Sequence, residues 1–168
     1  KVYNDWKKGA DGQWRYLDGN GTMAVNSWVD GEYYVDSNGI MVTEKWLHVP
    51  EDDGEDEWYY FSASGKKVED TWKKISDKWY HFDSNGAMER GWILDDTYYT
   101  GDDGVMRTGW LTDSKLDDNG DSDNSYYYCG EDGARALGWQ WLEIPENWID
   151  DSDDVTDYVH DNGQYAWF

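Results

Sequence analysis

Aromatic side chains are the residues of this chain whose types and spacing could bind a ligand. They make up 18% of the 168 residues and recur at fixed distances from a series of glycines. A tyrosine or histidine stands five positions before each glycine, and a tryptophan follows it by six or seven positions in all copies but the last. Electron-rich ring faces can hold a cation, and exposed Trp and Tyr rings can stack on sugars. The glycines are Gly21, Gly39, Gly65, Gly86, Gly104, Gly133 and Gly163.

The other reactive side chains are not arranged as a catalytic site. His48, His81 and His160 are scattered without a metal spacing or a nucleophile partner, and Cys129 lacks an accompanying base. With 37 acidic residues, carboxylates fall close together by chance, so paired acids do not indicate a glycosidase. The sequence contains no nucleophile elbow and no phosphate loop. We therefore predict a protein without enzymatic activity and without a cofactor, in which Cys129 is a small core residue.

One acidic segment has oxygen ligands at alternate positions, as calcium loops do. It lacks the glycine at the sixth place and the glutamate at the twelfth, where Ser122 and Tyr128 stand. We interpret it as a solvated acidic loop and predict no metal site, with weak calcium association as the alternative. The four residues concerned are Asp117, Asn119, Asp121 and Asp123.

The charge of the chain excludes one class of partner. The formal net charge is -23 with only 14 basic residues, so the basic stripe of a nucleic-acid-binding protein is missing. No apolar run approaches the roughly 20 residues that a membrane helix needs. The chain opens at Lys1 without a hydrophobic leader, and we expect an excised module whose signal peptide, if any, lies elsewhere.

The elements that must position the rings are short repeats. Self-similarity at a period of roughly 20 to 50 residues is typical of arrays whose units bury their apolar faces on one another. The strong charge and the low number of Leu, Ile, Val and Phe residues, 25 in all, would together indicate disorder, but each aromatic side chain can bury on the order of 150 to 250 Å². We predict one repeat domain over residues 1–168, with a capping last unit. The units span 6–27, 28–45, 46–71, 72–91, 92–109, 110–138 and 139–168.

Each unit carries a β-hairpin signal. In the fourth, an aromatic run ending at Phe82 leads into a turn with Gly86 and then a short apolar segment with Met88, and the glycine supplies a positive φ. Side chains alternate along a strand, so the residues seven and five before the glycine share one face, and those six and four before it share the other. Because both faces are apolar and a lone hairpin is marginal in water, we predict an all-β solenoid of about seven stacked β-hairpins. Methionines two after the glycine would fill gaps between rings. Lys67, Arg135 and Tyr165 replace them in three units.

Acidic insertions lengthen three units at the same point, between the opening Trp and the aromatic run. Insertions confined to one point of a repeat map to one edge of a solenoid. We expect these segments to form an acidic edge, which is a candidate surface for a protein partner. They are residues 51–57, 117–123 and 150–154.

The pattern Trp, spacer, Trp-Tyr-Tyr-Phe, Asp-x-x-Gly, x-Met, Gly-Trp resembles the choline-binding, or cell-wall-binding, repeats of Gram-positive surface proteins. It is also similar to the related glucan-binding regions of glucosyltransferases. Residues 79–92 and 98–110 carry the pattern best, and it extends over nearly the whole chain. The resemblance implies a left-handed stack of hairpins that holds the choline of teichoic acids between consecutive hairpins. It also implies a secreted protein of the bacterial cell surface.

What the family implies about site residues is a cage of three rings around each quaternary ammonium: the opening Trp, the Trp seven before the glycine, and a Tyr of the next unit. Such a cation donates no hydrogen bond, so ring faces must recognise it. Units two and five lack the second Trp, because Glu32 and Thr97 stand there. The implied cages are Trp6 and Trp14 with Tyr34; Trp46 and Trp58 with His81 or its neighbour Tyr80; Trp72 and Trp79 with Tyr99; and Trp110 and Tyr126 with Tyr158.

Three functions follow as hypotheses. The first is a non-catalytic module that attaches a larger secreted protein to choline-bearing wall polymers, without contact with nucleic acid or insertion into a membrane. The second is a carbohydrate-binding module for a glucan or host glycan, since Trp and Tyr platforms stack on sugar rings. The third is a structural or adhesive stalk in which the aromatic rings only pack.

Overall fold

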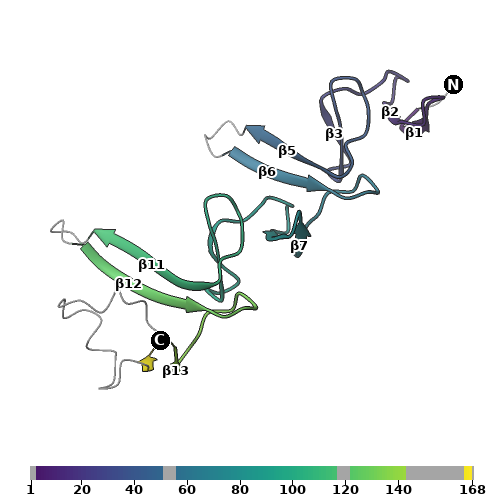
Figure 1. Cartoon of the computed structure of the whole chain (residues 1–168). Coiled ribbons are helices and arrows are strands. Elements are labelled where there is room, and N and C mark those ends of the chain that lie inside the picture. The colour runs from purple at the N-terminus through teal and green to yellow at the C-terminus, as the bar shows by residue number, and fades with distance from the viewer. Residues whose placement is uncertain (1–2, 51–55, 117–121, 143–164, 168) are drawn as a thin grey trace. The chain divides into compact units, whose positions relative to one another are not determined.

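The computed structural model describes residues 3–50, 56–116, 122–142 and 165–167. Every regular element in these ranges is a β-strand, and the strands pair into two-stranded antiparallel hairpins (Figure 1). This confirms the all-β prediction of repeated hairpins. The chain forms two compact units, residues Lys1–Glu89 and Arg90–Phe168, each described by itself below.

Each hairpin corresponds to one repeat read from the sequence, although in the first six repeats the first strand begins one residue before the predicted boundary. The first compact unit, residues Lys1–Glu89, contains four hairpins. They are β1 (Asp5–Lys8) with β2 (Trp14–Leu17), β3 (Ser27–Val29) with β4 (Tyr33–Val35), β5 (Lys45–Pro50) with β6 (Asp56–Phe61), and β7 (Thr71–Ile75) with β8 (Lys78–Phe82). The second contains β9 (Gly91–Ile93) with β10 (Tyr98–Thr100), β11 (Gly109–Leu116) with β12 (Ser122–Cys129), and β13 (Trp139–Trp141) with β14 (Tyr165–Trp167).

The pairing within each hairpin differs from the sequence prediction. The aromatic run was expected to pair with the methionine segment that follows the glycine. It pairs instead with the strand that carries the opening Trp, so that Trp46 lies directly opposite Tyr60. The methionine segment adds only one bridge, as between Val35 and Met41.

The methionine segment also bonds to the preceding repeat. The N–H of Met41 donates to the carbonyl of Trp14 at 2.9 Å, and the N–H of Met88 donates to the carbonyl of Trp58 at 2.8 Å. The same two residues form the single bridge to their own aromatic strand. This segment therefore joins consecutive repeats.

The predicted Asp-x-x-Gly turn is present and is held by its aspartate. In the fourth repeat the carboxylate of Asp83 accepts the N–H groups of Asn85 and Ala87, each at 2.8 Å. Gly86 adopts a φ of +82°, in the left-handed region that glycine enters without a steric penalty. The turn residues thus have the roles that the sequence predicted.

The core lies on the face formed by the residues four and six before each glycine. The residues four before it are fully buried in repeats two to six: Val35, Phe61, Phe82, Thr100 and Cys129. Burial also raises the pKa of the Cys129 thiol, which confirms its interpretation as a small core residue. Consecutive hairpins share this core, because the Trp28 ring of one repeat contacts Tyr59 and Phe61 of the next at centroid distances of 5.0 and 5.7 Å.

Neighbouring hairpins do not extend one another's sheets. Each sheet contains two strands, and Figure 1 shows the β5–β6 hairpin pointing in a different direction from the hairpin that begins with β3. Side-chain packing and single backbone bonds therefore join the repeats. Within each unit, the opening Trp of one hairpin therefore faces a ring of the next, as Trp28 faces Tyr59 and Trp92 faces Tyr127.

Candidate functional site

Some of the rings predicted to bind a ligand come together where one hairpin meets the next. Each meeting place combines four positions. One hairpin supplies the opening Trp and the residue seven before the glycine, and the next supplies the residues six before and two after its own glycine. We call these places inter-hairpin clusters and number them by the earlier repeat. Four lie within a unit: Trp6, Trp14, Tyr33 and Met41 (first); Trp28, Glu32, Tyr59 and Lys67 (second); Trp46, Trp58, Tyr80 and Met88 (third); Trp92, Thr97, Tyr127 and Arg135 (fifth).

The third cluster places three rings at steep angles to one another. The centroids of Trp46 and Trp58 lie 6.4 Å apart with an interplanar angle of 78°, and those of Trp46 and Tyr80 lie 4.9 Å apart at 70°. Rings so inclined present faces and edges in different directions, as an aromatic cage requires. The Met88 N–H donates to the Trp58 carbonyl and joins the hairpin of the fourth repeat to that of the third.

Trp58, the second Trp of the third cluster, is the ring of this cluster that is most accessible to solvent. Trp58 is 37% exposed, whereas Phe82 beneath Trp46 is completely buried. His48 lies opposite Trp58 in the hairpin, and its ring packs against Trp58 with a centroid distance of 4.8 Å. The cluster thus has a buried apolar floor and one solvent-facing ring.

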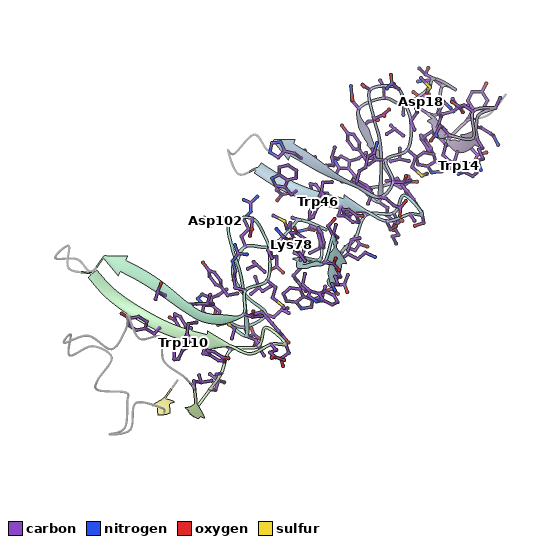
Figure 2. The ribbon with its side chains drawn as sticks, in the orientation of Figure 1. Trp14, Asp18, Trp46, Lys78, Asp102 and Trp110 are labelled. Atoms are coloured by element: carbon purple, nitrogen blue, oxygen red, sulfur yellow. The ribbon has the colours of Figure 1, made fainter. Side chains whose placement is uncertain are left out.

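The first cluster has the same register. Trp6 contacts Tyr33 of the next repeat at 5.5 Å and 66°. Trp14 is 42% exposed, and its carbonyl accepts the Met41 N–H. Lys8 lies opposite Trp14, with its ammonium 5.9 Å from the ring centroid. Trp14 and Trp46, one ring from each of these two clusters, are labelled in Figure 2.

An ion pair fixes the turn beside Trp14. Arg15 donates to both carboxylate oxygens of Asp11, at 2.6 and 3.0 Å. The Arg15 guanidinium holds the pKa of Asp11 well below its usual range, at about 2. The pair therefore stays charged at neutral pH and constrains the end of the strand that carries Trp14.

The second and fifth clusters differ from the first and third at two positions. Glu32 and Thr97 replace the second Trp, as the sequence indicated. Lys67 and Arg135 replace the methionine, and the structure places both charged groups close to the opening Trp. In these two clusters a cation therefore lies near the opening Trp, whereas the cation of the first cluster, Lys8, lies near the second Trp.

One predicted cage residue is assigned to the wrong neighbour. Tyr34 lies directly opposite Trp28 in its own hairpin, with ring centroids 5.5 Å apart, so its ring belongs to the face that looks toward the third repeat. The ring of the second repeat that contacts Trp6 is Tyr33. Alternation along the strand explains the difference, because adjacent residues point to opposite faces. In the third cluster the same rule selects Tyr80, while His81 contacts Trp72 at 5.0 Å.

The remaining predicted residues are divided between the units or lie outside the described ranges. Trp72 and Trp79 belong to the first unit, where Trp79 is 42% exposed. Tyr99 belongs to the second and contacts Trp92 at 5.1 Å.

The predicted cage of the sixth repeat is described only in part. Trp110 contacts Tyr128 at 5.3 Å, and Tyr126 lies on the same strand opposite Thr112. Tyr158 lies outside the described residues.

The residues that sequence reasoning missed are Tyr33 and the residues two after the glycine. Strand alternation was a sufficient signal for Tyr33, since the face six and four before the glycine was already recognised as apolar. For Met41 and Met88 the repeat gave the position but not the partner, because the backbone bond to the preceding hairpin depends on the three-dimensional stack.

Most of the alternative calcium loop lies outside the described residues. Residues 117–121 lie outside the described ranges, and Asp123 is described only as part of β12. Within the described parts of the chain, no group of three or more His, Cys, Asp or Glu side chains could hold a metal ion. The same residues include no helix that is long and apolar enough to cross a membrane.

Two family models match the sequence. A putative cell wall binding repeat matches residues 51–67 and 70–88, and a choline-binding repeat matches residues 1–40. Among curated proteins, no sequence matches this chain.

Solved structures from Streptococcus pneumoniae share the fold. The modular autolysin LytC, solved with a synthetic peptidoglycan ligand, is similar over 99% of this chain with a TM-score of 0.69 and 21% identity. Choline binding protein F, solved in the presence of a peptidoglycan analogue, is similar over 82% of this chain with a TM-score of 0.60 and 33% identity. This chain spans only 32% of the autolysin and 42% of choline binding protein F. The similarity supports the predicted stack of β-hairpins.

Proposed function

Because this chain is built from choline-binding repeats of the cell-wall-binding family, as its sequence predicted, we propose that it is a non-catalytic module that binds choline groups of a wall polymer. The single observation that carries this proposal is the third cluster. There, Trp58 and Tyr80 flank Trp46 at interplanar angles of 78° and 70°. The first cluster has the same residue types at these positions, Trp6, Trp14 and Tyr33, and Trp6 contacts Tyr33 at 5.5 Å and 66°.

Quaternary ammonium suits these clusters for a physical reason. The cation has methyl groups in place of N–H donors, so it gains little from the polar groups of a protein and more from ring faces. Each cation–π contact contributes roughly 0.5 to 2 kcal/mol. The net charge of -23 raises the local concentration of any cation near the protein.

Binding at several sites along one polymer would make the attachment strong. Two or more weak sites on one chain can raise avidity by factors of about 10² to 10⁴ over a single site. We propose that the module in this way tethers a larger secreted protein to choline-bearing teichoic acid at the surface of a Gram-positive bacterium.

Calorimetric titration with choline tests the proposal. Weak individual sites with Kd near 1 mM, about -4 kcal/mol, require choline concentrations well above that value. We expect saturable binding by the chain and loss of one site in each of Trp14→Ala and Trp58→Ala. Thr97→Ala is the matched control, since Thr97 has the same register position in the fifth cluster, and it should leave binding unchanged.

Ligand controls separate choline from other occupants. Ethanolamine keeps the hydroxyethyl group but lacks the methyl groups, and it should bind much more weakly. If the protein is retained on dextran at all salt concentrations and shows no binding of choline, the carbohydrate-binding hypothesis is favoured instead. Absence of heat and of any change in Trp fluorescence with choline would refute the proposal.

A further inference from the structure

We propose that Lys67 and Arg135 are internal ligands: each brings its own cationic group to an inter-hairpin cluster and thereby closes the second and fifth clusters to external choline. The inference rests on the proposed function, because it says which clusters of this chain bind choline and which do not. It starts from the fact that both cations stand in the methionine position of the later repeat. The same two clusters are the ones with Glu32 or Thr97 in place of the second Trp.

The backbone gives the internal cations the same starting point as the methionines. The N–H of Lys67 donates to the carbonyl of Glu32 at 2.8 Å, and the N–H of Arg135 donates to the carbonyl of Thr97 at 2.7 Å. These bonds are equivalent to the one from Met88 to Trp58 in the third cluster. The side chain at this position therefore leaves the backbone at an equivalent place in all these clusters, and its chemistry decides what it brings there.

The ammonium group of Lys67 has three contacts that hold it in place. Its ammonium lies 5.8 Å from the Trp28 ring centroid, within the range of a cation–π contact. The ammonium also donates to the carbonyl of Asn85 at 2.5 Å and lies 3.5 Å from the carboxylate of Glu69. Only 12% of the side chain is exposed, compared with 46% for the adjacent Lys66. Lys67 is therefore more buried and has more contacts than the neighbouring surface lysine.

Arg135 contacts two rings. Its guanidinium carbon lies 5.3 Å from the Trp92 centroid and 6.0 Å from the Tyr127 centroid. Trp92 and Tyr127 are themselves 4.7 Å apart at 64°. They occupy the positions that Trp46 and Tyr80 hold in the third cluster. The guanidinium therefore contacts the ring pair that would face choline in an open cluster.

An attached cation has an advantage over a dissolved one. Its effective concentration is set by the fold, and it does not lose translational freedom on binding. An external ammonium would have to displace it and leave the Lys67 or Arg135 charge without its ring partner. The loss of the second Trp removes one further contact from that competitor. Both differences act in the same direction, against external choline.

The test with choline converts the second cluster into a copy of the third. In Glu32→Trp/Lys67→Met the second cluster regains both residues of an open cluster, and we expect calorimetry to count one more choline site than in the unchanged chain. Glu32→Trp/Lys66→Met is the matched control, because Lys66 pairs with Glu32 at 3.0 Å but is not anchored near Trp28, and it should gain no site. The inference would be overturned if the unchanged chain already bound choline at Trp28. It would also be overturned if the converted chain folded, bound choline at the first and third clusters, and gained no site.

A second measurement needs no choline and therefore separates this inference from the proposed function. In the folded chain, ring currents of Trp28 should shift the ε-methylene protons of Lys67 upfield of those of Lys66 in the NMR spectrum, and unfolding in urea should abolish the difference. Equal shifts for the two lysines in the folded state would show that Lys67 does not occupy the cluster. If the lysine shift is present and choline does not bind anywhere, the proposed function fails while the internal contact stands.

Discussion

At the scale of single residues, one step along the strand decides which hairpin a ring serves. Tyr33 contacts Trp6 of the preceding repeat, while Tyr34 contacts Trp28 of its own hairpin. The sequence supplied the composition of the cage and the spacing of its members, but the resemblance assigned Tyr34. The alternation of side chains, which is also readable from the sequence, gives Tyr33. The residue-level error therefore came from carrying over a position instead of applying strand geometry.

This assignment predicts opposite results for two neighbouring substitutions. Tyr33→Leu removes one of the three rings of the first cluster, worth roughly 0.5 to 2 kcal/mol, so choline affinity there should fall by about 2- to 30-fold. Tyr34→Leu leaves the ring that faces Trp6 in place and should change this affinity little. Calorimetry in a Trp58→Ala background isolates the first cluster from the third. A larger loss in Tyr34→Leu than in Tyr33→Leu would contradict the assignment.

At the scale of the repeat, the turn glycine is required for two separate reasons, its backbone conformation and a close contact with the preceding repeat. Gly65 adopts a φ of +82°, and a Cβ built at this position would lie 2.2 Å from the sulfur of Met41 in the preceding repeat. The sequence predicted the first requirement from the turn. It could not predict the second, because the contact between Met41 and Gly65 exists only after the hairpins stack. The same limitation explains why the strand that pairs with each aromatic run was predicted incorrectly.

Substitution of Gly65 should therefore reduce the free energy of unfolding by more than the backbone penalty of the turn alone. Gly65→Ala combines a left-handed backbone penalty of roughly 1 to 2 kcal/mol with an overpacking penalty of roughly 1 to 3 kcal/mol. Gly12 has a φ of +79° and open space around its would-be Cβ, so Gly12→Ala should show only the backbone penalty. Urea unfolding followed by Trp fluorescence measures both. Equal losses of unfolding free energy in the two variants would show that the contact with Met41 is unimportant.

At the scale of the whole chain, charge opposes the compact state. A net charge of -23 on 168 residues repels itself, although some of the described acids have a basic partner, such as Asp11 with Arg15 and Glu32 with Lys66. Aromatic burial between hairpins must outweigh this repulsion. Screening by salt should therefore stabilise the protein without any specific binding.

Thermal unfolding at different salt concentrations checks this expectation. Raising the ionic strength from about 0.01 M to about 0.15 M shortens the Debye length from roughly 30 Å to roughly 8 Å, and Tm should rise. Choline chloride at the same ionic strength should raise Tm further, because a ligand that binds the folded state stabilises it by mass action. A Tm that falls with sodium chloride would show that attractive ion pairs outweigh the net repulsion.

The backbone bond between repeats has a consequence for how such chains change over generations. The residue two after the glycine donates the same N–H whether it is Met41, Met88, Lys67 or Arg135, so the fold does not depend on which side chain stands there. The methionine codon AUG differs by one nucleotide from the lysine codon AAG and from the arginine codon AGG. A point mutation at this codon can therefore place a cation at a cluster, or remove one, while the hydrogen bond that joins the two hairpins is kept. The number of open sites along the chain is then a heritable variable that selection can adjust one repeat at a time.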